Sequence, residues 1–80
     1  MGVVAAIEQK VRELLSEVRE GQDYTKLSVD IDFEEAGLDS LDTASLLLAI
    51  QETYDVDISD DDANELTTIR KVVDYMAART

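Results

Sequence analysis

The stretch of this chain with the clearest chemical potential is Gly-Leu-Asp-Ser-Leu-Asp at 37–42, where Ser40 lies between two aspartates. A serine hydroxyl can act as a nucleophile or carry a covalently attached group. Nucleophilic catalysis needs a base that takes the serine proton, and the chain contains neither histidine nor cysteine. Nothing in the pattern raises the pKa of a carboxylate by apolar burial, as acid–base catalysis requires. We therefore expect no enzyme, and the local pattern by itself favours an ordinary helix cap at Asp39 or Ser40.

A cation site is the second candidate chemistry. Residues 55–66, DVDISDDDANEL, begin like a calcium-binding EF-hand loop, with suitable oxygen ligands at loop positions 1, 3 and 5. Position 6 is then Asp60 instead of glycine, and position 12 is Leu66 instead of glutamate. We predict no dedicated metal site. An acidic helical adaptor or calcium-binding module stays open as an alternative class.

The charge is distributed unevenly over 80 residues, a length that suffices for one small domain. The formal net charge is −12, and no Lys or Arg lies between Leu27 and Ile69, where thirteen acidic residues lie. Such a field repels nucleic acid and anionic membranes and attracts basic protein surfaces. The longest apolar run, residues 46–50, is too short to cross a bilayer. We expect a soluble, cytoplasmic monomer that neither inserts into membranes nor binds nucleic acid.

The apolar pattern predicts an all-α protein, a small four-helix bundle that forms one domain over residues 1–80. The first helix has its apolar residues on one face and Gly21 as a C-terminal cap. The last helix begins after Thr67 or Thr68, either of which is a good N-cap. The residues expected to face inward from these two helices are Val4, Ile7, Val11, Leu14, Leu15, Val18, Ile69, Val72, Val73 and Met76.

A second helix is predicted from about Ser40 to Tyr54, and a short third one from Asp60 to Glu65 with Ser59 as its N-cap. Residues 22–38 lack a sustained period and form a long loop. Four apolar residues of this loop alternate as in a strand, but no second strand exists to pair with them. We expect some of the four to pin the loop to the helices: Leu27, Val29, Ile31 and Phe33.

The second helix has apolar residues on two sides. We assign one stripe to the core: Leu46, Leu47, Ile50 and Tyr54. The opposite stripe is flanked by Ser45 and Glu52 and consists of Leu41, Ala44 and Leu48. Because so small a domain has little protein left to cover both sides, we predict that the second stripe meets a partner through an apolar centre with a charged rim.

The triplet Asp39-Ser40-Leu41 at the start of an apolar helix resembles the motif of acyl carrier proteins. The likeness to the discrete, bacterial type II form extends from Phe33 to Met76 and includes Gly37, DSLDT, an acidic loop and LTT before the last helix. The first helix fits in pattern only. Peptidyl carriers tend to have Gly-His before the serine, where this chain has Leu-Asp. A carrier of D-alanine or another amino acid stays open as an alternative.

The resemblance implies that a phosphopantetheinyl transferase attaches 4′-phosphopantetheine from coenzyme A to Ser40. Acyl groups then form thioesters with the thiol of this arm and are presented to acyl-transferring, ketosynthase-type and other acyl-modifying enzymes of fatty-acid or polyketide biosynthesis. Housekeeping fatty-acid carriers often have acidic residues where this chain has Ser45 and Gln51, which favours a specialised pathway.

The resemblance also implies two groups of functional residues. Partner enzymes with basic docking surfaces would contact Leu41, Asp42, Ala44, Leu48 and Glu52. The acyl chain would be sequestered among Leu46, Leu47, Ile50, Ile58, Leu66 and Val73.

Overall fold

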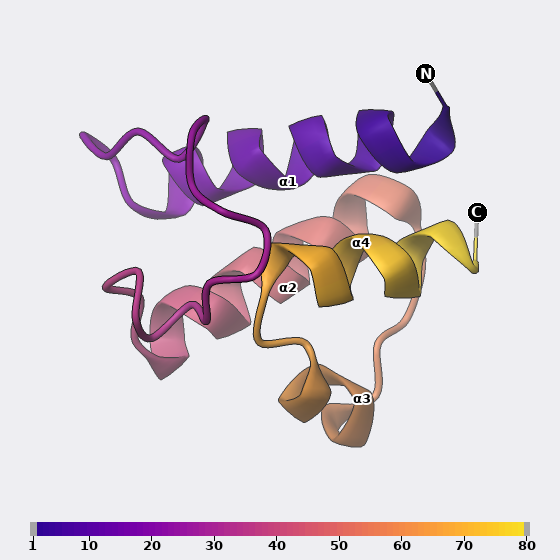
Figure 1. Ribbon diagram of the computed structural model, residues 1–80. Helices are drawn as coiled ribbons and strands as arrows, with labels where there is room; N and C mark the ends of the chain where they lie inside the picture. Colours follow the sequence, from indigo (N-terminus) through magenta and orange to yellow (C-terminus); the bar gives the residue numbers. More distant parts are fainter. Residues whose placement is uncertain (1, 80) are drawn as a thin grey trace.

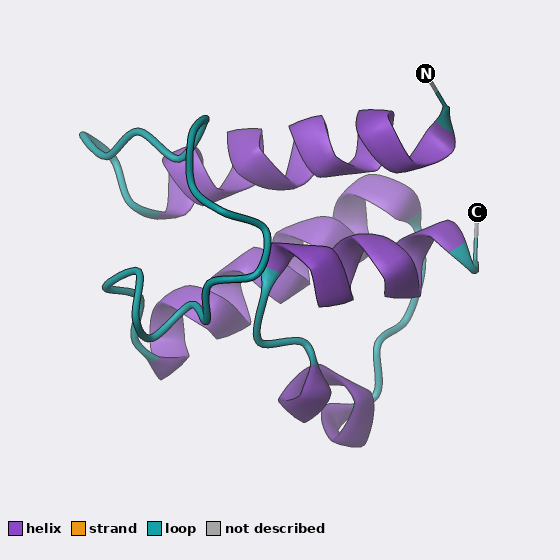
Figure 2. Cartoon of the chain, viewed as in Figure 1, coloured by secondary structure: helices purple, strands orange, loops and turns teal. Residues whose placement is uncertain are grey.

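The fold, described for residues 2–79 by a computed structural model, consists of four helices (Figure 1). They are α1 (Val3–Val18), α2 (Ser40–Tyr54), α3 (Asp60–Glu65) and α4 (Ile69–Ala77). Figure 2 shows helices and loops throughout the described part of the chain, and one isolated bridge joins Asp32 to Thr68. The predicted all-α class is therefore confirmed. Helices α2 and α3 have the predicted bounds, and α4 begins after Thr68, one of the two predicted caps.

Helix α1 packs against both α2 and α4 and runs in the opposite direction to both (Figure 1). Helix α3 lies within the connection between α2 and α4, on the side away from α1. The core lies where α1, α2 and α4 meet. Its fully buried side chains come from every long helix and from the loop before α2: Ile7, Val11, Leu15, Phe33, Leu46, Ile50, Ile69, Val72 and Met76.

Tyr54, at the last turn of α2, is half-buried and packs against the core, as its predicted stripe requires. Two predictions about α1 need correction. Val4 is 52% exposed, because it lies in the first turn of α1 at the edge of a small cavity shared with Val29 and Val73. Helix α1 already ends at Val18, so Gly21 is not its cap but lies in the following turn, where its φ of 87° favours glycine.

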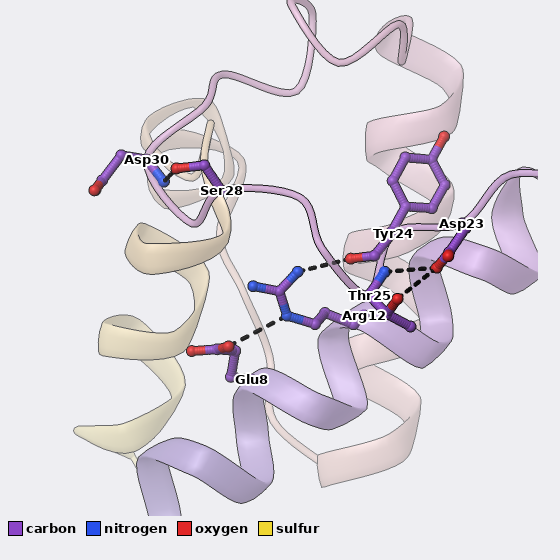
Figure 3. Close-up of polar contacts among 7 residues, drawn as sticks. All are labelled: Glu8, Arg12, Asp23, Tyr24, Thr25, Ser28 and Asp30. Carbon is purple, nitrogen blue, oxygen red and sulfur yellow. Dashed lines mark hydrogen bonds and ion pairs between the residues drawn. The ribbon is translucent and has the colours of Figure 1, made fainter.

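The first part of the long loop is held against α1 by Arg12 (Figure 3). Its Nη1 atom donates a 2.6 Å hydrogen bond to the carbonyl oxygen of Tyr24, and its Nε atom lies 3.2 Å from Glu8 Oε2. The side chain of Tyr24 is itself buried. Asp23 accepts hydrogen bonds from both the amide and the hydroxyl of Thr25, which tightens the turn.

The second part of the loop is tied to the segment that leads into α4. The Phe33 amide donates to the carbonyl oxygen of Thr67 over 2.8 Å, and the Arg70 amide donates to that of Val29 over 3.0 Å. The guanidinium of Arg70 also binds the Asp30 carboxylate, and this hydrogen bond lowers the pKa of Asp30. Phe33 is fully buried and thus pins the loop as predicted. No helix within residues 2–79 has the length and apolarity that crossing a membrane requires.

Candidate functional site

Ser40 is the first residue of α2, and its neighbours form a capping box around it. Asp39 Oδ1 accepts from the Asp42 amide over 2.8 Å, and Asp42 Oδ2 accepts from the Asp39 amide over 3.3 Å. The Thr43 hydroxyl donates to the Asp39 carbonyl oxygen over 3.1 Å. Asp39 therefore caps the helix. The side chain of Ser40 is exposed, and its hydroxyl makes no hydrogen bond within the part of the chain that the structure describes.

A tight turn fixes the chain immediately before this helix start. The amides of Gly37 and Leu38 donate to the carbonyl oxygens of Glu34 and Phe33 over 3.1 and 3.0 Å. Gly37 has a φ of 95°, in the left-handed region that side chains disfavour, so glycine suits this position. Phe33 and Leu38 are both buried. The turn thus has an apolar anchor at each end, and the position of Ser40 is well determined.

An ion pair between Arg19, the residue that follows α1, and Asp42 of α2 lies beside the same helix start. Arg19 Nη1 lies 3.0 Å from Asp42 Oδ2, and the side chain of Asp42 is only 19% exposed. This contact was not predicted, because nothing in the sequence marks two residues 23 positions apart as partners. The carboxylate of Asp42, which we predicted to face partner enzymes, is thus already engaged within the chain.

A cleft of about 360 Å³ opens beside Ser40, between the loop before α2, the first half of α2 and helix α3. We call it the Ser40 cleft. Its lining residues are Asp32, Phe33, Glu34, Asp39, Ser40, Thr43, Ala44, Leu47, Ala63, Asn64, Leu66 and Thr67.

The six residues predicted to sequester an acyl chain are all buried in the core. Leu47 and Leu66 also line the Ser40 cleft. Leu46 and Ile50 have no exposed surface, whereas Ile58 is 8% exposed, slightly more than the two cleft residues. The structure therefore brings two of the six next to Ser40 and places the other four elsewhere in the core.

The second apolar stripe of α2 is exposed, as expected from the positions of its residues on the side of the helix opposite the core stripe. Leu41 is 78% and Leu48 is 57% exposed, and Ala44 and Glu52 are exposed too. Such large exposed side chains on one face of a helix are typical of an interaction surface. The role of the stripe in partner docking stays a prediction.

The acidic segment after α2 has the local structure of a helix connection. Asp55 ends α2 in the left-handed conformation with a φ of 54°, and Ser59 Oγ caps α3 by accepting from the Asp62 amide. Residues 60–65 are helical, so they cannot wrap around a cation as an EF-hand loop does. Within residues 2–79, no group of three or more Asp, Glu, His or Cys side chains is arranged to hold a metal ion.

The comparison with protein families identifies the class of protein that this helical fold belongs to. Residues 5–76 match the family model described as Phosphopantetheine attachment site. This match covers most of the chain, and the chain belongs to that family. The protein is thus a non-catalytic carrier with covalently attached 4′-phosphopantetheine as its cofactor, and it interacts with a phosphopantetheinyl transferase and with acyl-handling enzymes.

Proposed function

We propose that Ser40 carries the phosphopantetheine arm, and that the protein is a discrete acyl carrier protein of fatty-acid or polyketide-type biosynthesis. The observation that carries this proposal is an exposed hydroxyl, without a hydrogen bond among residues 2–79, at the N-terminus of α2 and at the wall of a cleft. Three other serines are engaged locally: Ser16 donates to the Arg12 carbonyl oxygen, Ser28 accepts from the Asp30 amide, and Ser59 caps α3.

The attachment reaction is a phosphoryl transfer to the Ser40 oxygen. A new O–P bond forms between Oγ and the pantetheine-side phosphorus of coenzyme A, the pyrophosphate bond breaks, and adenosine 3′,5′-bisphosphate leaves. The chain has no histidine, and no carboxylate in the described residues accepts a hydrogen bond from the hydroxyl. We therefore propose that the base that takes the serine proton is supplied by the transferase.

The surroundings of Ser40 fit a phosphodiester. The amides of Ser40 and Leu41 have no hydrogen-bond partner among residues 2–79, and the positive end of the helix dipole favours a negative group there. Asp39 and Asp42 oppose this attraction, and the Arg19 guanidinium offsets the charge of Asp42. The balance favours an arm that leaves the helix start toward solvent or the cleft. When attached, the arm supplies the thiol that forms acyl thioesters, a group that a chain without cysteine cannot provide.

We further propose that partner enzymes dock on the exposed stripe of α2. Leu41, Ala44 and Leu48 would form its apolar centre, and Glu52 would contribute to its acidic rim. The absence of Lys and Arg between residues 27 and 69 supports partners with basic docking surfaces, since opposite charge speeds their encounter.

The attachment residue is tested by incubating the unmodified chain with coenzyme A and a transferase of broad specificity, followed by intact-mass measurement. We expect the wild-type chain to gain the mass of one phosphopantetheine group and Ser40→Ala to gain nothing. Ser45→Ala is the matched control, because Ser45 is also exposed on α2, and it should be modified like the wild type. An adduct that survives Ser40→Ala would refute the assignment.

A further inference from the structure

The Ser40 cleft has an acidic rim. Three of its lining residues are carboxylates, Asp32, Glu34 and Asp39, and no Lys or Arg lines it. Two basic side chains outside the lining contact residues at or beside it: Lys71 Nζ of α4 donates to Thr67 Oγ1 over 3.2 Å, and Arg19 is paired with Asp42. The charge that faces a group in the cleft is therefore negative on balance. An acyl group that ends in a carboxylate would be repelled there.

Asn64 of α3 lines the cleft together with Ser40 and has no partner for its side-chain amide among the described residues. An amide side chain offers both a donor and an acceptor. Thr43 lies on the α2 side of the cleft. Its hydroxyl donates to the Asp39 carbonyl oxygen and can still accept a hydrogen bond. A hydroxyl or keto oxygen that enters the cleft can thus form hydrogen bonds that a plain hydrocarbon chain cannot use.

The cleft is also small. A volume of about 360 Å³ lies near the lower end of ligand sites, which run from roughly 300 to 1,000 Å³. Leu47 and Leu66 line it and are only 5% and 4% exposed, and Leu46 and Ile50 of the same core have no exposed surface. A long saturated chain could enter the interior only by separating this packed core, which is costly.

We infer that the Ser40 cleft selects short, uncharged acyl groups that carry a hydroxyl or keto oxygen, and that Asn64 of α3 is the residue that positions this oxygen. The inference rests on the proposed function, because the acyl group reaches the cleft only from an arm on Ser40. It narrows the substrate class from acyl groups in general to partly reduced or unreduced short intermediates.

The test uses four forms of the full chain, each made by transferring an acylated arm from the corresponding acyl-coenzyme A. The acyl groups are 3-hydroxybutanoyl, butanoyl, succinyl and octanoyl. The NMR chemical shifts of each form are compared with those of the chain whose arm carries no acyl group. We expect 3-hydroxybutanoyl to shift the Asn64 side-chain amide and the Thr43 amide clearly more than butanoyl. Succinyl should leave both amide signals close to their positions in the form without an acyl group. Octanoyl should leave the methyl signals of Ile50 and Ile58 unchanged.

Asn64→Ala is the decisive variant, because Asn64 is exposed and its side chain makes no hydrogen bond with the described residues 2–79. In this variant, the Thr43 amide should respond equally to 3-hydroxybutanoyl and butanoyl. Glu65→Ala is the matched control, since Glu65 is exposed on the same helix and lies outside the cleft lining. It should retain the wild-type difference.

Two results would overturn the inference: octanoyl shifting the Ile50 and Ile58 methyls while the Asn64 amide stays unmoved, or equal responses to all four acyl groups. Neither result touches the proposed function, which requires only that the arm is attached to Ser40. A chain that accepts no arm, or accepts one on another residue, would instead refute the proposed function itself.

Discussion

Tyr75 joins the two C-terminal helices through its hydroxyl. This group donates a 2.7 Å hydrogen bond to Asp62 Oδ2 of α3, and the Arg79 guanidinium lies 3.5 Å from the centre of the Tyr75 ring. The hydrogen bond to a carboxylate holds the proton on the tyrosine and raises the pKa of Tyr75 above its ordinary value of 10.0. Because α3 has only six residues and no buried side chain, this contact is important for its position, and α3 forms one wall of the Ser40 cleft.

Tyr75→Phe should lower the urea midpoint of unfolding slightly at neutral pH, because the hydrogen bond to Asp62 is lost. A pKa that is higher in the folded than in the unfolded chain gives stabilisation that is complete below the unfolded value and is lost as pH rises through the folded value. The difference between wild type and Tyr75→Phe should therefore be constant from pH 7 to about 9 and shrink above about 10.

Tyr54→Phe is the matched control for this experiment. Tyr54 is also half-buried, but its hydroxyl makes no hydrogen bond within residues 2–79. Its replacement should leave the midpoint unchanged at every pH. A Tyr75→Phe chain as stable as the wild type at neutral pH would show that the contact with Asp62 contributes nothing to stability.

At the scale of elements, the starts of α2, α3 and α4 were predictable because the signals that set them are local. Asp39, Ser59 and Thr68 each accept a hydrogen bond from the amide three residues further on, and the residue type alone indicates such a cap. The exposed hydroxyl of Ser40 and the two apolar stripes of α2 follow from the same local pattern.

The contacts that place the elements relative to one another were not predictable from the sequence. Arg70 meets Asp30 across 40 positions, and Arg19 meets Asp42 across 23. Both pairs depend on the tertiary fold and have no period or motif. The same holds for Asn64. In the sequence it is only a polar residue of a short helix, and the fold places it in the lining of the cleft that also contains Ser40.

Helix α2 offers a direct test of the docking stripe. Leu48→Arg should preserve the fold, since Leu48 is 57% exposed, and should lower kcat/KM of the transferase for the chain by about tenfold, equivalent to about 1.4 kcal/mol. The physical reason is an uncompensated positive charge against a basic partner surface. Steady-state kinetics with the chain as varied substrate measures this loss.

Thr53→Arg carries the same charge change at another exposed position of α2, about 140° further around the helix. It should be used nearly as well as the wild type. An equal loss of kcat/KM in both variants would show that the transferase responds to the net charge of the chain and not to a docking stripe. Unfolding of Leu48→Arg, seen by circular dichroism, would assign Leu48 a role in the core.

For the whole molecule, the dominant physical feature is charge. A formal net charge of −12 is confined to a body with extents of 30 × 29 × 20 Å. At about 0.01 M salt the screening length is about 30 Å, so every carboxylate interacts with every other one. Among the described residues, four ion pairs use basic side chains of α1, of Arg19 just after it and of α4. Two of these pairs reach acids of the span without bases, Asp30 and Asp42. The same field that favours basic partners therefore destabilises the folded carrier.

Raising NaCl from about 0.01 M to about 0.5 M should raise the thermal midpoint by several degrees, because about 1 kcal/mol corresponds to about 4–8 °C in a domain of this size. The double variant Glu35→Gln and Asp57→Asn removes two exposed carboxylates that hold no contact in the described residues. It should start from a higher midpoint at low salt and gain less from added salt. Differential scanning calorimetry at matched ionic strength in NaCl and MgCl₂ separates screening from ion binding. Equal midpoints support screening, whereas a saturating rise at micromolar Mg²⁺ would reveal a bound cation and contradict this account.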